Sequence, residues 1–272
     1  MTMYWIYDIP NWLLGLLTIV VFVGVSVVGL YLTRPMMRRF LDGSGKDNEL
    51  VSWFIAAVGV LYGLALGLIA VATYGNYSDA DNKASKEAAS LGSLYRNVDF
   101  YDQPLRGDLE TRLRIYTRFV IEKNWPAHRK GLVLDDGGRM LEEFENIVSE
   151  FEPVKEREKI AQAEVVRSLN AVIDNREFRI QSVGAGLPAV LWGVVLVGAA
   201  LNIAMTYLYW IDNLKLHALM VAAFSAAIGL LVFLTAAMDN PFRGEFSVSP
   251  DAYKSVLDKV MTPVPVGEAK RP

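Results

Sequence analysis

The sequence has no cysteine among its 272 residues. This absence excludes disulfide bonds, thiolate metal sites and cysteine nucleophiles, and it leaves the redox compartment open. Histidine is scarce as well, since only His128 and His217 occur, far apart in the chain. We therefore expect no metal site and no cofactor. The net charge of −3 is close to neutral and argues against a nucleic-acid partner.

Charged residues make up 21% of the chain, yet four long apolar stretches contain none of them. These stretches are residues 12–32, 50–74, 183–210 and 216–238. Each has at least about 20 residues, which lets a helix cross a hydrocarbon core of roughly 30 Å. The sequence thus predicts an all-α, polytopic, integral membrane protein with four transmembrane helices that contact membrane lipids.

The lack of Asp, Glu, Lys and Arg inside these spans also bears on function. Intramembrane charge marks proton relays and ion-coupled transport, so its absence counts against a proton pump or a secondary transporter. It is compatible with a passive pore whose narrow part is apolar, or with a non-conducting protein. No convergent set of catalytic residues is present, so we expect no catalytic site and no enzyme.

The polar residues are concentrated between the second and third spans. We divide the chain into a first transmembrane hairpin (1–74), an extramembrane helical domain (75–182), a second hairpin (183–238) and a C-terminal tail (239–272). The domain shows helical spacing of apolar residues and no strand alternation. Its expected buried positions are Leu105, Leu109, Leu113, Tyr116, Val120, Leu141, Phe144, Val148, Val166, Leu169 and Ile173. Helical spacing continues across both borders of the domain, so we expect spans two and three to extend into it as long helices.

Small residues recur on one face of the second span. Gly59, Gly63, Gly67 and Ala70 share this face, with Tyr74 at its end. Glycine inside a helix costs about 1 kcal/mol relative to alanine, so three glycines need a reason. In lipid, small residues at every fourth position let two backbones approach closely. The face therefore packs against a helix of the same chain, or it forms a subunit contact or a pore wall.

Four further residues are candidates for polar contacts. Asn202, in the third span, lines a path or bonds to a neighbouring helix. Glu87 and Arg96 follow the second span on one predicted helix, nine residues apart, so a direct pair between them is not forced. Arg243 follows the fourth span closely. It contacts lipid headgroups, attracts anions or bonds to the helical domain.

The orientation of the chain follows from its loop charges. The loop between spans one and two contains Arg34, Arg38, Arg39 and Lys46, whereas the loop between spans three and four has only Lys215. Short loops rich in Lys and Arg stay in the cytoplasm. This rule places both termini and the helical domain outside the cytoplasm.

Three ordered motifs resemble those of the bacterial bestrophin-like membrane proteins. They are YGLALGLIAVATYGNYSDADNKASKEAASLGSLYRN, LRIYTRFVIEKNWPA and DNPFRGEFSVSP. The resemblance covers nearly the whole chain, with one departure: Asn124 stands before Trp125 where a Glu is expected.

The resemblance implies the architecture of bestrophins, which are pentameric anion channels with four spans and a helical domain continuous with spans two and three. It implies a bacterial inner-membrane location, a homo-oligomer and a pore lined by the second span, which here is the Gly59–Tyr74 helix. It also implies a cytoplasmic helical domain, in conflict with the loop charges.

Three functions remain open at this point. The first is an oligomeric ion channel permeable to anions such as chloride. The second is a non-conducting scaffold or accessory subunit of a membrane complex. The third is a stator-like protein, as in flagellar motors or TonB-type systems, which share the layout of two spans, a helical block and two spans. A stator needs a membrane-protein partner whose helix carries a protonatable carboxylate.

Overall fold

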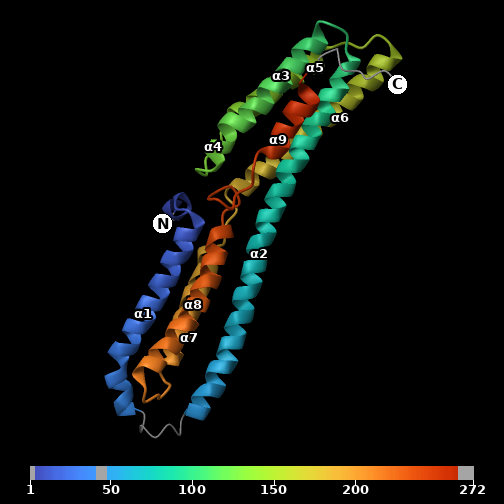
Figure 1. The fold of residues 1–272 in the computed structure, drawn as a ribbon. Helices are drawn as coiled ribbons and strands as arrows, with labels where there is room; N and C mark the ends of the chain where they lie inside the picture. Colours follow the sequence, from blue (N-terminus) through green and yellow to red (C-terminus); the bar gives the residue numbers. More distant parts are fainter. Residues whose placement is uncertain (1–3, 41–47, 263–272) are drawn as a thin grey trace, which may run out of the picture. The chain divides into compact units, whose positions relative to one another are not determined.

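The computed structural model of the chain describes residues 4–40 and 48–262, and every regular element in these ranges is helical (Figure 1). The chain divides into two units. We call residues 1–76, 186–240 and 244–246 the membrane unit, and residues 77–185, 241–243 and 247–272 the helical unit. The elements are η1 (Tyr4–Asp8), α1 (Asn11–Phe40), α2 (Asn48–Asn97), η2 (Val98–Phe100), α3 (Leu105–Phe119), η3 (Val120–Asn124), α4 (Trp125–His128), α5 (Asp136–Glu150), α6 (Glu156–Val183), α7 (Ala189–Thr206), α8 (Leu214–Met238), α9 (Asp251–Val256) and η4 (Leu257–Met261).

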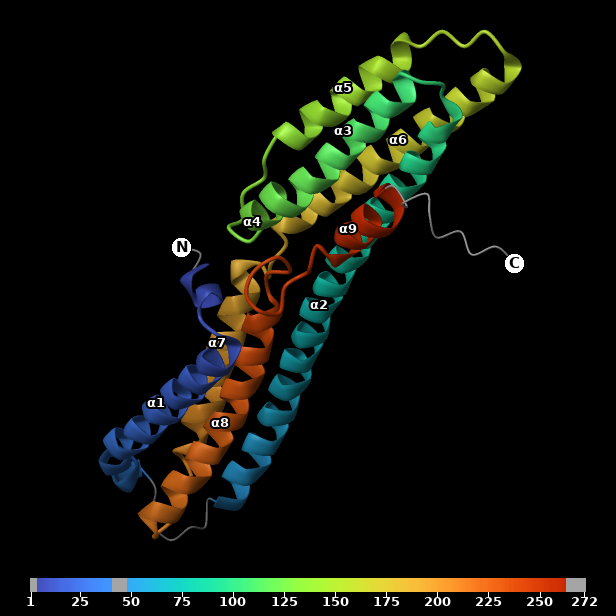
Figure 2. The same cartoon turned by 45° about the horizontal axis from the view of Figure 1, so that its top comes forward.

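The membrane unit contains α1, α7, α8 and the first part of α2. All four helices are long and apolar enough to cross a membrane, which confirms the prediction of four spans. Helix α8 packs against α1 and α7, and Figures 1 and 2 show the three side by side. Gly229 of α8 allows a close approach, because a Cβ at this position would lie 3.3 Å from Cβ of Phe22 on α1.

Two side chains fix helix ends in the membrane unit. Asn213 accepts hydrogen bonds from the backbone N–H groups of Lys215 and Leu216, and so caps the start of α8. Asp239, just after α8, accepts from the backbone N–H of Leu187 at 2.5 Å and from the indole N–H of Trp192 at 3.1 Å. Asp239 therefore ties the end of α8 to the start of α7.

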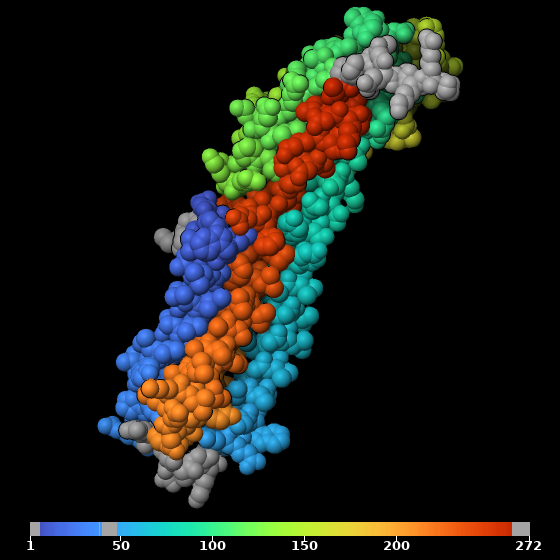
Figure 3. All heavy atoms as spheres, in the orientation of Figure 1, coloured from blue at the N-terminus to red at the C-terminus, as the bar shows by residue number. Residues whose placement is uncertain are grey.

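The helical unit contains the second part of α2, together with α3, α5, α6 and α9 (Figure 2). Its core includes buried side chains from all five helices, among them Leu91, Leu113, Phe144, Leu169 and Tyr253. Figure 3 shows the red segment that contains α9 and η4 beside α2, and η4 also contacts α3. The contact with α2 occurs at Gly92, where a Cβ would lie 3.5 Å from Val256.

The two predicted helix extensions differ in outcome. Helix α2 runs unbroken from Asn48 to Asn97, so the continuation of span two is confirmed. The continuation of span three is wrong, because α6 ends at Val183 and α7 begins only at Ala189. The intervening residues read GAGLP. Glycine disfavours a helix, and proline keeps the residue before it out of the helical region.

Most apolar positions predicted for the helical domain are buried, but α6 needs a correction. Val166 is 38% exposed, and the side chains that pack inward are Val165, Leu169 and Val172. Leu169 is buried as predicted and Ile173 packs partly buried against the core, so Val166 is the wrong position, and Val165 and Val172 complete the buried face. Of the positions discussed above, Lys46 and residues 263–272 of the predicted tail lie outside the described residues.

Candidate functional site

The glycine face of α2 is only partly covered by the chain itself. A Cβ on Gly59 would lie 3.8 Å from Oδ1 of Asn202 on α7, so Gly59 faces a neighbouring span. A Cβ on Gly63 or Gly67 would have no neighbour within 4 Å. Tyr74, at the end of the face, is 57% exposed. The reading of a contact within one chain therefore applies to Gly59 but not to Gly63 or Gly67.

Helix α2 contacts α7 through a different set of residues beside this face. The Tyr62 hydroxyl donates to the Val195 carbonyl at 2.9 Å, and the Tyr62 ring covers Gly198. Leu66 is buried in the same contact. Only 6% of the most apolar stretch of α2 is buried inside the chain, the lowest share of the four spans. Much of α2 is thus available to another molecule.

Asn202 lies on the buried side of α7. Its Nδ2 donates to the Gly198 carbonyl one turn earlier at 2.9 Å, and its side chain is 3% exposed. The Nδ2 group therefore bonds to its own helix backbone, and Oδ1 faces Gly59 of α2.

The helical unit contains a buried ion pair between Glu87 of α2 and Arg179 of α6. Nε of Arg179 lies 2.6 Å from Oε2 of Glu87, and Nη2 lies 3.3 Å from Oε1. The Tyr116 hydroxyl of α3 donates to the same Oε1 at 2.9 Å. Both charged side chains are fully buried. Burial alone would lower the pKa of Arg179, but the charge of Glu87 raises it overall, so the guanidinium stays charged.

His128 extends this network on its other side. Its Nε2 accepts a hydrogen bond from Nη1 of Arg179, and its Nδ1–H donates to the Leu132 carbonyl at 3.0 Å. Burial, and next the charge of Arg179, lower the pKa of His128 to about 4. The imidazole is therefore neutral at pH 7, and this tautomer satisfies both ring nitrogens.

Aromatic rings surround the ion pair. The Arg179 guanidinium lies 5.6 Å from the centroid of Trp125, and the rings of Phe242 and Tyr253 pack against Trp125 edge-on. The indole N–H of Trp125 donates to the Val248 carbonyl at 2.9 Å. Burial and the charge of Glu87 raise the pKa of Tyr253 well above its usual value, so its hydroxyl stays protonated.

The network and its aromatic shell join the three motifs that suggested the family. Glu87 comes from the first motif, Tyr116 and Trp125 from the second, and Phe242 from the third. The network side chains Glu87, Tyr116, His128 and Arg179 are at most 1% exposed. These four side chains bond to one another and are closed off from solvent, so the network holds helices together and is not a substrate site. We call these four residues the polar clamp.

The remaining charged candidates have separate positions. Arg243 is 7% exposed, and its guanidinium lies over Gly131, where a Cβ would overlap it. Of the three readings for Arg243, this position matches contact with the helical domain. Arg96 is exposed and donates to Ser93 at 3.4 Å, whereas Glu87 pairs with Arg179. Glu87 and Arg96 therefore form no ion pair with each other.

Asn124 lies beside a second arginine of α6. Its Nδ2 is 3.4 Å from the position that a Cβ of Gly137 would take, and Nε of Arg176 is 3.6 Å from the same point. Oδ1 of Asn124 and Nε of Arg176 are buried without a hydrogen-bond partner. A carboxylate at position 124 would suit this neighbourhood better than an amide.

Sequence reasoning missed Arg179 and found no partner for His128. Arg179 follows Val165 and Val172 at intervals of seven residues, so a charge stands on the apolar stripe of α6. This spacing is the sequence feature that could have identified Arg179 as a buried charge. Among the described residues, no three His, Cys, Asp or Glu side chains are grouped so that they could hold a metal ion.

Comparison with known proteins supports the resemblance. The Bestrophin-like domain matches residues 20–253. Two crystal structures of a bacterial bestrophin homologue from Klebsiella pneumoniae, one of them a point variant, superpose with a TM-score of 0.68 at 10% and 9% identity. The first superposition covers 91% of this chain and 97% of the homologue, and the second covers 90% and 96%. Similarity at this identity shows the fold. No curated protein matches the chain in sequence.

Proposed function

This chain belongs to the bestrophin-like family, and we propose that it forms an oligomeric transmembrane ion channel, permeable to anions, with α2 at the pore axis. The observation that carries this proposal is the uncovered small-residue face of α2. Gly63 and Gly67 meet nothing within 4 Å in their own chain, although glycines in a span favour close contact. Symmetry-related copies of α2 around an axis would use this face.

The chemistry of the spans supports a passive pore. Residues 50–74 of α2 carry no charged side chain, so a path beside them would select ions by size and by the cost of removing water. The preference for anions and the count of five subunits are carried over from the resemblance to bestrophins.

Chloride flux from liposomes containing the purified protein tests the proposal. We expect wild-type protein to conduct and Gly63→Leu to reduce the flux roughly tenfold or more, because leucine side chains would crowd a narrow path. Gly193→Leu on α7 is the matched control. A Cβ on Gly193 also meets nothing within 4 Å, so this variant should fold and conduct normally.

Three outcomes would contradict the proposal. Equal flux from Gly63→Leu and wild type would remove α2 from the pore axis. A stable oligomer that gives no chloride flux would instead favour the non-conducting scaffold, and co-purification with a single-span protein would favour the stator-like reading.

A further inference from the structure

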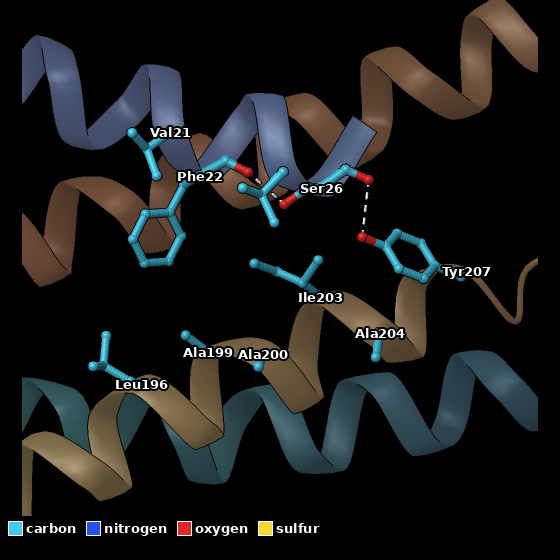
Figure 4. A pocket seen from close by; sticks show the side chains of 10 residues that line it. Val21, Phe22, Ser26, Leu196, Ala199, Ala200, Ile203, Ala204 and Tyr207 are labelled. Atoms are coloured by element: carbon cyan, nitrogen blue, oxygen red, sulfur yellow. Dashed lines mark hydrogen bonds between the residues drawn. The ribbon is translucent and has the colours of Figure 1, made fainter. Parts of the chain in front are cut away.

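A groove of about 360 Å³ lies between α1 and α7 in the membrane unit (Figure 4). Val21 and Val25 of α1 form one wall. Ala199, Ala200 and Ala204 of α7 form the other, and their small side chains leave the space open. Tyr207 closes the groove at the end of α7.

The polar groups that line the groove have partners. The Tyr207 hydroxyl donates to the backbone carbonyl of Ser26 at 2.8 Å, and the Ser26 hydroxyl donates to the Phe22 carbonyl at 2.6 Å (Figure 4). The other lining residues are apolar. Apolar cavities without unsatisfied polar groups stay free of water, so the groove offers no site for water or for a polar ligand.

The groove opens to the surroundings of the spans. Val21 and Val25 are 57% and 69% exposed, and Ala200 and Ala204 are exposed as well. Both helices are membrane spans, so their surroundings are acyl chains. An empty groove would forfeit dispersion contacts along both walls, which favours filling it.

We propose that this groove binds one acyl chain of a phospholipid. A hydrocarbon chain matches this apolar lining, and both walls belong to membrane spans that acyl chains surround. The groove ends at Tyr207, and tyrosine prefers the headgroup level. Arg34, on the part of α1 beyond Ser26, lies at the loop that follows Tyr207, since it donates to the Ile211 carbonyl at 2.9 Å. This places a positive charge toward the phosphate.

Photo-crosslinking tests the site on the full-length protein. The protein is reconstituted into phosphatidylethanolamine and phosphatidylglycerol vesicles that contain phosphatidylglycerol with a diazirine in its acyl chain. We expect crosslinks to concentrate on residues 21–26 and 196–207. Ala200→Leu with Ala204→Leu fills the groove and should lower this yield roughly fivefold. Ala223→Leu with Ala227→Leu, two exposed alanines four apart on α8, should leave it unchanged.

Three results would overturn the proposal: crosslinks spread evenly over all spans, no loss in the groove-filling variant, or an equal loss in the control. A separate measurement tests whether a second copy of the chain occupies the groove. The chain has no cysteine, so Ala204→Cys introduces a single thiol. A disulfide-linked dimer of this variant in membranes would assign the groove to a contact between copies. The crosslinking does not depend on ion flux, so its result is separate from that of the proposed channel function.

Discussion

Buried polar groups are satisfied in different ways in the membrane unit and in the helical unit. In the membrane unit, Ser26, Thr73 and Ser225 each donate to a carbonyl four residues earlier on their own helix. In the helical unit, Glu87 and Arg179 bond to each other across 92 residues of sequence. A bond within one helix satisfies a hydroxyl without help from a neighbouring helix. The ion pair in the helical unit forms only when α2 and α6 pack together.

This difference follows from the surroundings of each unit. Lipid offers no hydrogen bonds, so serine and threonine hydroxyls in the spans bond to their own helix backbone, and helices associate through close packing. In water, a helical unit gains stability from a buried core and can hold a charge there only when the charge is paired. Variants in the helical unit should therefore affect stability more than those in the spans.

Glu87→Ala tests this comparison most strongly. The variant leaves Arg179 buried without its carboxylate, a change that typically costs about 3–5 kcal/mol. We expect the helical unit to be destabilised by this amount. The measurement is hydrogen exchange in detergent-solubilised protein, in which the α6 amides should lose protection. Ser225→Ala removes one local hydroxyl of α8 and should cost about 1 kcal/mol or less.

Two controls isolate the ion pair. Arg96→Ala alters an exposed charge on the same helix as Glu87 and should cost less than about 0.5 kcal/mol. Combining Glu87→Leu with Arg179→Met removes both charges and should recover part of the stability. The comparison between the two units would fail if Ser225→Ala destabilised the protein as much as Glu87→Ala.

Acid should weaken the helical unit through His128. Its pKa in the folded state is about 4, below the usual 6.5, so the unfolded chain binds an extra proton between these values. The stability that neutral His128 contributes is complete above pH 6.5 and is lost as the pH falls toward 4. The loss approaches about 3 kcal/mol.

His128→Gln provides the reference, because glutamine does not titrate. We expect the free energy of unfolding of wild type to decline relative to this variant between pH 6.5 and pH 4. Parallel pH profiles for the two proteins would show that His128 does not titrate in this window.

Gly131→Ala should reduce stability by a smaller amount, because the change is confined to the turn under Arg243. Gly131 has φ of +72°, a conformation that costs other residues about 1–2 kcal/mol, and a Cβ would displace the Arg243 guanidinium. Thermal unfolding should show a clear decrease in Tm. Gly184→Ala is the matched control, because Gly184 has φ of −96° and a Cβ there meets nothing within 4 Å. An equal decrease in both variants would rule out the strain at Gly131 as the cause.

Features set by local spacing could be predicted from the sequence. The four spans follow from uninterrupted apolar runs, and the stripe of Leu109, Leu113 and Tyr116 on α3 follows from helical periodicity. Span three was extended too far because helical spacing resumes on both sides of Gly184–Pro188. A break of this kind depends on the conformation of a few residues, which a periodic pattern does not reveal.

The clamp could be predicted only in part, because its members are far apart in sequence. Glu87 was a candidate, but nothing near it identifies Arg179 or His128 as its neighbours. Pairing at this separation depends on the packing of α2 against α6. The role of the glycine face of α2 stays a prediction, because it concerns a second copy of the chain.

Asn124→Asp should give the smallest effect, and it should stabilise the helical unit. Arg176 and Arg179 bring two positive charges to this part of α6, and Glu87 is the carboxylate paired with Arg179. An aspartate at position 124 would place a second carboxylate near Nε of Arg176, which has no hydrogen-bond partner. We expect a gain of about 1 kcal/mol at pH 7, seen as a rise in Tm. The arginine should hold the carboxyl pKa below its usual value, so the gain should vanish as the pH falls below about 4. Asn124→Leu separates charge from packing, since a gain of equal size there would mean that removing the unsatisfied amide suffices.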